Sequence, residues 1–208
     1  MRLRRPMRIC KICFHNFFDD SLIHLANNNL CICKNCLKDI RAKFIKFDVD
    51  GVSAVSIYDY DDRIQSLLYQ FKGCYDYELK DVFLGRYSRE LSIRYKNYIV
   101  VPVPSYVEDD EEREFNHVVE IFKSLKLQML FLLKKTARVK QATSTSSQRK
   151  NINKHIELID KPDLSNKKIL IVDDVYTTGS TMKAAISLIG QLNPKKIRVL
   201  VISKTKLE

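Results

Sequence analysis

The sequence lacks any apolar run long enough to span a membrane, which takes about 20 consecutive residues. Its first ten residues, MRLRRPMRIC, are basic but have no apolar core of the kind that a secretory signal peptide needs. Both absences predict a cytoplasmic protein, in which disulfides are rare. The six cysteines are therefore expected to be metal ligands rather than disulfide partners.

Acidic residues are scarce in two segments of the 208-residue chain, which has room for one α/β domain and a small appendage. Residues 1–48 carry ten Lys or Arg against four Asp or Glu, and residues 134–154 carry seven and no acid. These two basic segments indicate a polyanionic partner such as nucleic acid, or phosphate-rich ligands. Ordinary solvated lysines are the equally weighted alternative.

Four of the six cysteines form two C-x2-C pairs separated by nineteen residues: Cys10, Cys13, Cys33 and Cys36. Because Zn²⁺ takes four thiolates in a tetrahedron, this spacing predicts a structural zinc site with no open coordination position. Cys31 could replace Cys33, but we expect Cys33 to be the ligand. His15 and His24 are further substitutes and are expected to be structural or exposed.

The stretch Lys167–Met182, KKILIVDDVYTTGSTM, predicts a strand, an acidic pair, a loop of small residues and a helix. Ile169–Val172 is apolar and β-branched, as in a strand buried on both faces of a parallel sheet. Helical spacing of apolar residues begins near Ser180 and ends at Gly190. Together with further apolar runs, this predicts an α/β fold with a parallel sheet.

Asp173 and Asp174 are expected at the carboxyl end of that strand, where ligands of open α/β sheets bind. The loop after them can cradle a phosphate with amides and hydroxyls: Thr177, Thr178, Gly179, Ser180 and Thr181. Carboxylates beside a phosphate need another partner, such as sugar hydroxyls or Mg²⁺, so a phosphorylated sugar fits both halves. A buried strand followed by a capped helix, with solvated acids, is the alternative. A Walker A loop is excluded because no GK[ST] is present.

The rest of the chain predicts alternating strands and helices after a boundary between residues 1–48 and 49–208. We expect strands over residues 52–58, 98–104, 128–133, 156–159 and 197–202. We expect helices over residues 64–71, 77–95 and 118–127, and an acidic loop over residues 105–112. Lys72 beside Gly73 could reach a phosphate, although a solvated helix end is the simpler interpretation.

The DDVYTTGST stretch resembles the phosphoribosyl diphosphate (PRPP) signature of type I phosphoribosyltransferases. With the four cysteines, FKGCYDYEL, IVVPVP and an R-x-F-N element, in this order, the chain resembles the ComF family of competence proteins, its ComFC-type members most of all. The family has Arg-Gly-Phe-Asn-Gln where this chain has Glu114 and His117 at the Gly and Gln positions. The resemblance implies a phosphoribosyltransferase-like parallel sheet flanked by helices, preceded by a small four-cysteine zinc module.

The resemblance also implies roles for individual residues. Asp173 and Asp174 would hold and orient the ribose, the Thr177–Thr181 loop would hold the 5′-phosphate, and Mg²⁺ would accompany PRPP. Residues 134–154 would form a flexible hood loop, in which three cations meet the diphosphate or a nucleic-acid backbone: Lys140, Arg149 and Lys150. Arg113 and Asn116 would bind the ligand or order their loop.

The function implied is DNA uptake in natural transformation, at the cytoplasmic face of the membrane. The protein would bind a PRPP-type ligand and single-stranded DNA and work beside a helicase-like ATPase. The alternative is an active phosphoribosyltransferase that moves ribose 5-phosphate from PRPP to a nitrogen acceptor. Thr177 stands where purine-using relatives have a proton-handling carboxylate, which favours binding over catalysis. A PRPP-responsive transcription regulator ranks last, because no helix-turn-helix is recognisable.

Overall fold

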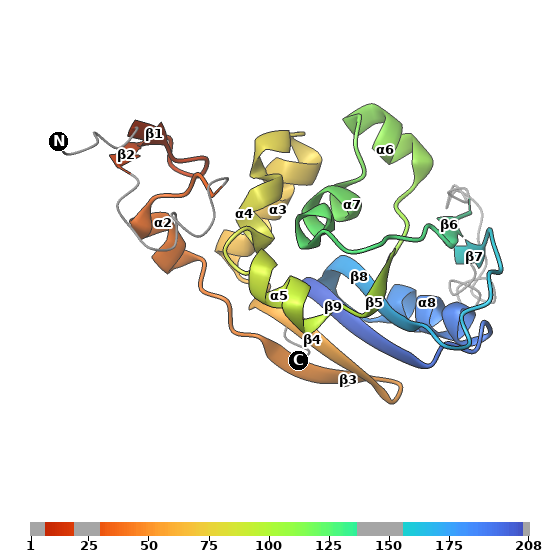
Figure 1. Ribbon diagram of the computed structural model, residues 1–208. Coiled ribbons are helices and arrows are strands. Elements are labelled where there is room, and N and C mark those ends of the chain that lie inside the picture. The colour runs from red at the N-terminus through yellow and green to blue at the C-terminus, as the bar shows by residue number, and fades with distance from the viewer. Residues whose placement is uncertain (1–6, 19–29, 137–155, 206–208) are drawn as a thin grey trace.

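A computed structural model describes residues 7–18, 30–136 and 156–205, and its centre is a five-stranded sheet (Figure 1). The strand order is β3-β4-β9-β8-β5. The strands are β3 Ile45–Val49, β4 Val52–Asp59, β5 Tyr98–Pro102, β8 Lys168–Tyr176 and β9 Lys196–Lys204. The β3–β4 hairpin is antiparallel, and all other pairings in the sheet are parallel.

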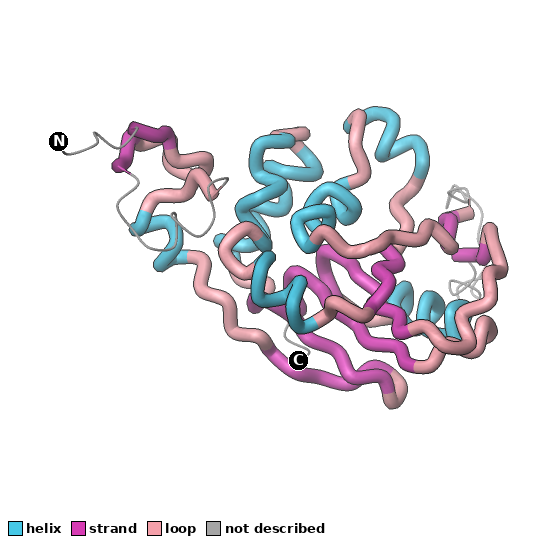
Figure 2. Tube along the Cα trace, in the orientation of Figure 1, coloured by secondary structure: helices cyan, strands magenta, loops and turns pink. Residues whose placement is uncertain are grey.

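The apolar run of β8 is buried on both faces of the sheet, as predicted. Leu170 and Val172 belong to one buried cluster, and Ile169 and Ile171 belong to a second cluster on the other face. This alternation follows from the two-residue period of a strand. The first cluster includes residues of α3 Asp62–Gly73, α4 Lys80–Leu84, α5 Ser88–Arg94 and α7 His117–Phe122. The second includes residues of α8 Ser180–Gly190, so helices cover both faces (Figure 2).

The predicted long helix over residues 77–95 is wrong, because the chain divides there into η1 Tyr77–Leu79, α4 and α5. The break lies at Gly85, where an added Cβ would be 2.4 Å from the Asp81 carbonyl oxygen and 3.1 Å from Leu30 Cδ1. Leu30, which directly precedes Cys31 in the sequence, therefore lies close to the space that a side chain at position 85 would need. A helical pattern alone does not reveal this packing.

The predicted acidic loop is also wrong in part, because α6 covers Val107–Arg113. Three acids lie in the first turn of α6, where they interact favourably with its free N–H groups: Glu108, Asp109 and Asp110. The strand expected over residues 128–133 is reduced to one bridge between Met129 and Val100. The chain then forms β6 Leu133–Lys135, which pairs with β7 Ile156–Leu158 outside the main sheet.

The N-terminal segment consists of β1 Met7–Ile9, β2 Asn16–Phe18 and α2 Lys34–Asp39. It contacts the rest of the protein through Lys11, whose Nζ lies 2.9 Å from Glu78 Oε2 and 3.6 Å from Asp81 Oδ2. β3 crosses the predicted boundary after residue 48 and pairs with β4, so the sheet begins at Ile45. Within the described ranges, no helix has the length and apolarity needed to cross a bilayer.

Candidate functional site

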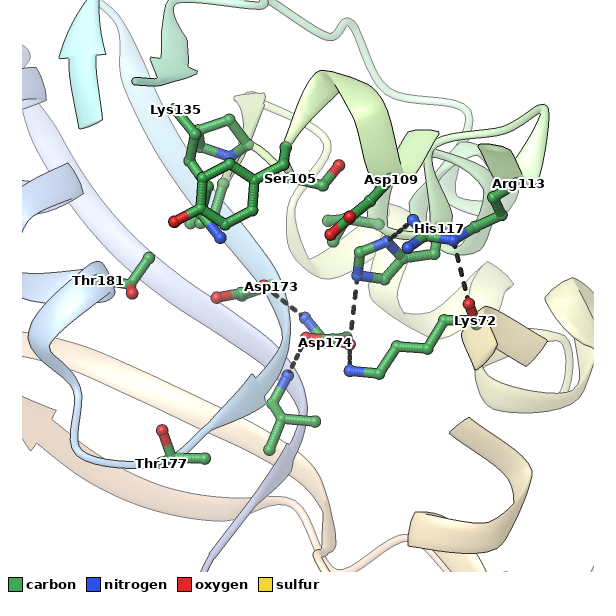
Figure 3. Close-up of a pocket in the computed structure, with 15 residues that line it drawn as sticks. Lys72, Ser105, Asp109, Arg113, His117, Lys135, Asp173, Asp174, Thr177 and Thr181 are labelled. Atoms are coloured by element: carbon green, nitrogen blue, oxygen red, sulfur yellow. Dashed lines mark hydrogen bonds and ion pairs between the residues drawn. The ribbon is translucent and has the colours of Figure 1, made fainter. Parts of the chain in front are cut away.

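The acidic pair lies inside β8, which continues to Tyr176, and not beyond the strand as expected. Successive side chains of a strand point to opposite faces. Asp174 therefore shares a face with Val172, toward α3 and α7, whereas Asp173 points toward the α8 side (Figure 3). The two carboxylates have different surroundings in consequence.

Asp174 is almost completely buried and is held by two donors from distant segments. Its Oδ2 lies 2.6 Å from Lys72 Nζ and 3.3 Å from His117 Nε2, and its Oδ1 accepts the Val175 N–H at 2.6 Å. Burial alone would raise the pKa of Asp174, but the bonds from His117 and Lys72 hold it well below its usual range. Asp174 is therefore a charged carboxylate whose oxygens are both engaged.

The tautomer of His117 follows from its second contact. Arg113 Nη1 lies 3.0 Å from His117 Nδ1, and a guanidinium can only donate. Nδ1 must therefore accept, which leaves the proton on Nε2, where it is donated to Asp174. Arg113 also donates from Nε to the Lys72 carbonyl oxygen at 3.1 Å. These contacts join the end of α3, α6 and α7 around one carboxylate.

Asp173 is half-buried and has a different electrostatic character. Burial, followed by the neighbouring charge of Asp174, raises the pKa of Asp173 well above the ordinary 3.8. Its Oδ1 accepts the Asp174 N–H at 2.9 Å. Asp173 lines both of the cavities described next, whereas Asp174 lines the larger one.

The loop after β8 encloses a small cavity of about 50 Å³ at the start of α8. Gly179 has φ +78° and caps the helix, and a Cβ there would come within 2.3 Å of the Tyr176 hydroxyl oxygen. The first turn of α8 presents free N–H groups and its positive dipole end to this cavity. Thr177, Ser180 and Thr181 line it as well, so both amides and hydroxyls are available to an anion.

A larger cavity of about 470 Å³ continues from the small one, sharing Asp173, Val175, Thr177 and Thr181 with it. Its far wall comes from the segment after β5 and from α6 and α7. Three cations also line the cavity: Lys72 of α3, Arg113 of α6 and Lys135 of β6. Lys72 pairs with Asp174 and Arg113 with Asp110, and Asp109 lines the cavity as well. The combined space therefore offers an anion cradle, then a carboxylate, then a region that holds both cations and carboxylates (Figure 3).

Of the two residues expected to bind the ligand or order their loop, only Arg113 lines this cavity. Asn116 caps α7 by accepting the Val119 N–H at 2.9 Å, and its Nδ2 donates to Asp110 Oδ2 at 2.7 Å. Asn116 thus orders the loop that carries Arg113. The hood-loop cations Lys140, Arg149 and Lys150 lie outside the described residues.

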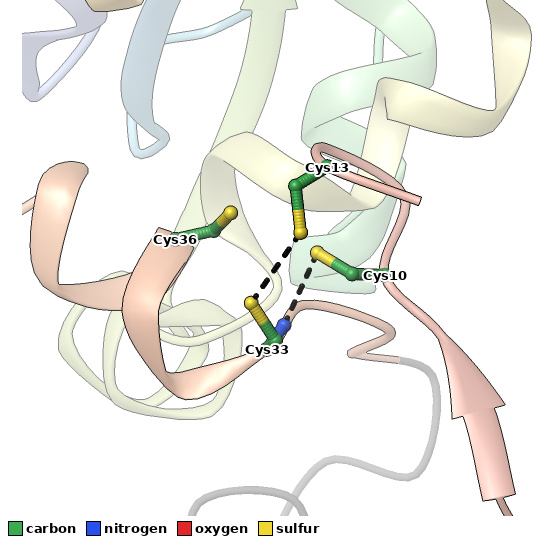
Figure 4. A group of neighbouring side chains, drawn as sticks. All are labelled: Cys10, Cys13, Cys33 and Cys36. Carbon is green, nitrogen blue, oxygen red and sulfur yellow. Dashed lines mark hydrogen bonds between the residues drawn. The ribbon is translucent and has the colours of Figure 1, made fainter. Parts of the chain in front are cut away.

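The four cysteines predicted as ligands form one cluster, with all sulfur atoms within 4.8 Å of one another (Figure 4). Cys13 Sγ and Cys33 Sγ are 3.7 Å apart, close to the ~3.8 Å expected between thiolates bound tetrahedrally at 2.3 Å from Zn²⁺. Cys31 is not part of the cluster, and its Sγ lies 3.9 Å from Arg8 Nη1. The cluster is therefore compatible with a structural metal such as zinc.

Comparisons with known proteins give one match to the C-terminal part of the chain and one over most of its length. Residues 115–206 match the family model of the phosphoribosyl transferase domain. The chain is 27% identical over 201 residues to competence protein ComFC of Streptococcus pneumoniae (strain ATCC BAA-255 / R6), covering 86% of this chain and 90% of that protein. The chain is ComFC-like, with a phosphoribosyltransferase domain.

Other similarities of the ComFC-like chain are shorter or more distant. It is 42% identical over 48 residues to hypoxanthine-guanine phosphoribosyltransferase of Homo sapiens, which covers 22% of each chain. A solved hypoxanthine phosphoribosyltransferase from Staphylococcus aureus is 12% identical with a TM-score of 0.40, covering 62% of this chain and 67% of that chain. A hypoxanthine-guanine phosphoribosyltransferase from Bacillus anthracis str. 'Ames Ancestor' is 10% identical with a TM-score of 0.39, covering 62% and 73%.

The ComFC-like chain departs from the usual motif of the ComF family at two positions, and the structure shows the setting of each. Glu114, at the family's Gly position, has φ +63°, a left-handed conformation that glycine adopts without strain. His117, at the Gln position, donates to Asp174. The sequence did not predict that contact or the place of Lys135 in the cavity. The R-x-F-N element directly before His117 was the available signal.

Proposed function

We propose that this ComFC-like protein is a competence factor for DNA uptake that binds a phosphoribosyl ligand of the PRPP type and single-stranded DNA. The observation that supports the phosphoribosyl ligand is the joined cavity, by which we mean the connected cavities of about 50 and 470 Å³ beside β8. Amides and hydroxyls at the start of α8 suit a 5′-phosphate, and Asp173 lies where it can accept sugar hydroxyls. Lys135, which lines the larger cavity, suits a second phosphate group.

The order of these groups favours a phosphorylated pentose over a simple anion. An anion alone would need no carboxyl group beside it, and Asp173 would repel it once ionised. A sugar hydroxyl can donate to Asp173 while the phosphate binds the loop, so the same residue attracts the sugar. Lys135 lines the larger cavity, where the diphosphate of PRPP would meet it with Mg²⁺.

Isothermal titration calorimetry with ribose 5-phosphate, and with PRPP and Mg²⁺, tests this proposal. Thr181→Val removes a hydroxyl from both cavities at nearly constant volume and should weaken ribose 5-phosphate binding about tenfold. Ser187→Ala, exposed on the same helix outside both cavities, should bind normally. Absence of binding by the unaltered protein, or equal binding by both variants, would exclude this site.

An active phosphoribosyltransferase is the second candidate, and Lys135 in the larger cavity is the feature that favours it. A nitrogen acceptor would form a bond to ribose C1 while the C1–O bond breaks, and diphosphate would leave with the electron pair. Release of diphosphate from PRPP with a panel of nitrogen bases would support this reaction. Silence across the panel, with PRPP still bound, would leave the binding function alone.

The DNA-binding part of the proposal is supported by the excess of cations in residues 1–48 and 134–154. Binding of single strands should weaken steeply with salt, because each neutralised phosphate releases a counterion. The helicase-like ATPase partner is proposed from the family resemblance alone. Co-purification with that ATPase from competent cells, absent after deletion of its gene, is the corresponding test.

A further inference from the structure

A further cavity, of about 450 Å³, lies where α2 meets the turn between α4 and α5. Four cations surround it: Lys34, Lys38, Arg41 and Arg86. Its apolar lining comes from Leu37, Ala42 and the ring of Tyr87. Among the residues that the structure describes, no carboxylate lines it. We call it the α2 basic cavity, and it is separate from the joined cavity at β8.

Three of the four cations of the α2 basic cavity have no acidic partner among the described residues. Lys34, Lys38 and Arg41 are exposed and form no ion pair with another described residue. Other lysines of the protein do have such partners, as Lys11 has Glu78. Like charges placed around one concave surface repel one another, and a bound anion relieves that repulsion.

The spacing of the cations indicates an anion with more than one charged group. Lys34 and Lys38 are four residues apart on α2, which places them on one face at about 6 Å along the axis. Arg41 continues in the same direction just beyond the helix, and Arg86 approaches from the α4–α5 turn. A chain of phosphates can contact more of these cations at once than a single phosphate can.

The apolar lining distinguishes a nucleic acid from a bare polyphosphate. The Tyr87 ring packs edge-on against the Phe44 ring, with 5.2 Å between the ring centroids. The Arg86 guanidinium lies 5.5 Å from the centroid of the Tyr87 ring. Aromatic rings and guanidinium planes among cations are the surfaces on which unpaired bases stack. A duplex would keep its bases away from such a surface, so a single strand is the better occupant.

We propose that the α2 basic cavity is a binding site for single-stranded nucleic acid, whose phosphates contact Lys34, Lys38, Arg41 and Arg86. This inference rests on the DNA-binding part of the proposed function and gives that part a location. The location differs from the hood-loop cations that the sequence favoured. The cysteine cluster contributes to it, since Cys33 is the N-cap of α2 and Cys36 lies within that helix. The α4–α5 turn supplies the opposite wall, so the strand would contact both parts of the protein.

Fluorescence anisotropy with labelled oligo(dT) tests the location through two charge-matched triple variants of the full chain. Lys34→Glu, Lys38→Glu and Arg41→Glu together should weaken binding more than about tenfold and lower the salt slope by about 2. Lys161→Glu, Lys195→Glu and Lys196→Glu change net charge equally on exposed residues outside this cavity. They should leave the slope unchanged. Equal losses in the two triples would overturn the proposal.

Three further probes identify the occupant. Oligo(dT) should bind more tightly than inorganic polyphosphate of equal charge and more tightly than a DNA duplex. Tighter binding of poly-glutamate would assign the cavity to an acidic protein partner and overturn the proposal. So would a loss confined to Lys140→Glu, Arg149→Glu and Lys150→Glu, which would place the DNA at the hood-loop cations.

Failure here and failure of the phosphoribosyl site can be told apart. The α2 triple variant should bind ribose 5-phosphate as the unaltered protein does, because its three residues lie outside the joined cavity. Oligo(dT) binding that survives in a protein with no affinity for ribose 5-phosphate would sustain the α2 basic cavity alone. An unchanged urea midpoint of the triple variant establishes that a loss of DNA binding is not a loss of folding.

Discussion

Lys72 Nζ lies 2.6 Å from Asp174 Oδ2, although 102 residues separate them in the sequence. The pair joins the C-terminal end of α3 to β8, the fourth strand of the five-stranded sheet. With His117 it keeps Asp174 charged in a buried position, whereas Asp173 is more exposed and lines both parts of the joined cavity. The predictions below follow from this division and from the cysteine cluster.

Replacing Lys72 by Met removes the cation from Asp174 while keeping most of the aliphatic stem. We expect the free energy of unfolding to fall by about 1–2 kcal/mol, a value discounted because the Lys72 side chain is 36% exposed. Lys183→Met is the matched control, because Lys183 pairs with Asp50 on the surface. That variant should lose less than about 0.5 kcal/mol in the same urea titration. Equal losses would mean that the Asp174 pair behaves as a surface ion pair.

The raised pKa of Asp173 predicts an unusual dependence of stability on pH. Above its ordinary value of 3.8, the unfolded chain has lost this proton while the folded protein keeps it. Stability should therefore fall as the pH rises from 3.8 toward the raised pKa. Asp173→Asn removes this dependence and should be more stable than the unaltered protein near neutral pH. The difference should shrink toward pH 4.

Urea midpoints of both proteins between pH 4 and pH 8 would measure this effect. A midpoint of Asp173→Asn that stays below that of the unaltered protein throughout would contradict it. Because the ionised carboxylate accepts hydroxyl groups better than the neutral acid does, the same titration predicts that ribose 5-phosphate binds more tightly as Asp173 loses its proton.

The cysteine cluster predicts which thiol holds the metal. Cys33→Ser should remove zinc from the purified protein, whereas Cys31→Ser should retain about one zinc per chain. Elemental analysis of both variants, purified without chelator, measures the difference. Loss of zinc from Cys31→Ser with retention in Cys33→Ser would reverse the assignment.

The left-handed conformation of Glu114 predicts a stabilising substitution. Glu114→Gly should raise the free energy of unfolding by about 1 kcal/mol, because glycine has no Cβ to strain at φ +63°. Glu111→Gly, inside α6, should lower it by a similar amount. Thermal melts of the two variants should therefore shift in opposite directions, and a downward shift for Glu114→Gly would contradict the account.

Local sequence patterns predicted much of this protein. The apolar run at Ile169–Val172, the small loop and the Gly190 stop predicted β8, its turn and α8, because each signal lies within one continuous stretch. The C-x2-C spacing predicted the members of the cysteine cluster for the same reason.

Tertiary structure alone decided how the site is divided. Lys72 and His117 reach Asp174 from α3 and α7, and the α2 basic cavity forms between a helix and a turn far apart in the chain. No spacing rule within one element encodes such contacts, since they depend on the path of the chain between elements. The helix expected over residues 77–95 is divided in the structure into η1, α4 and α5, and the apolar pattern of those residues did not mark the breaks.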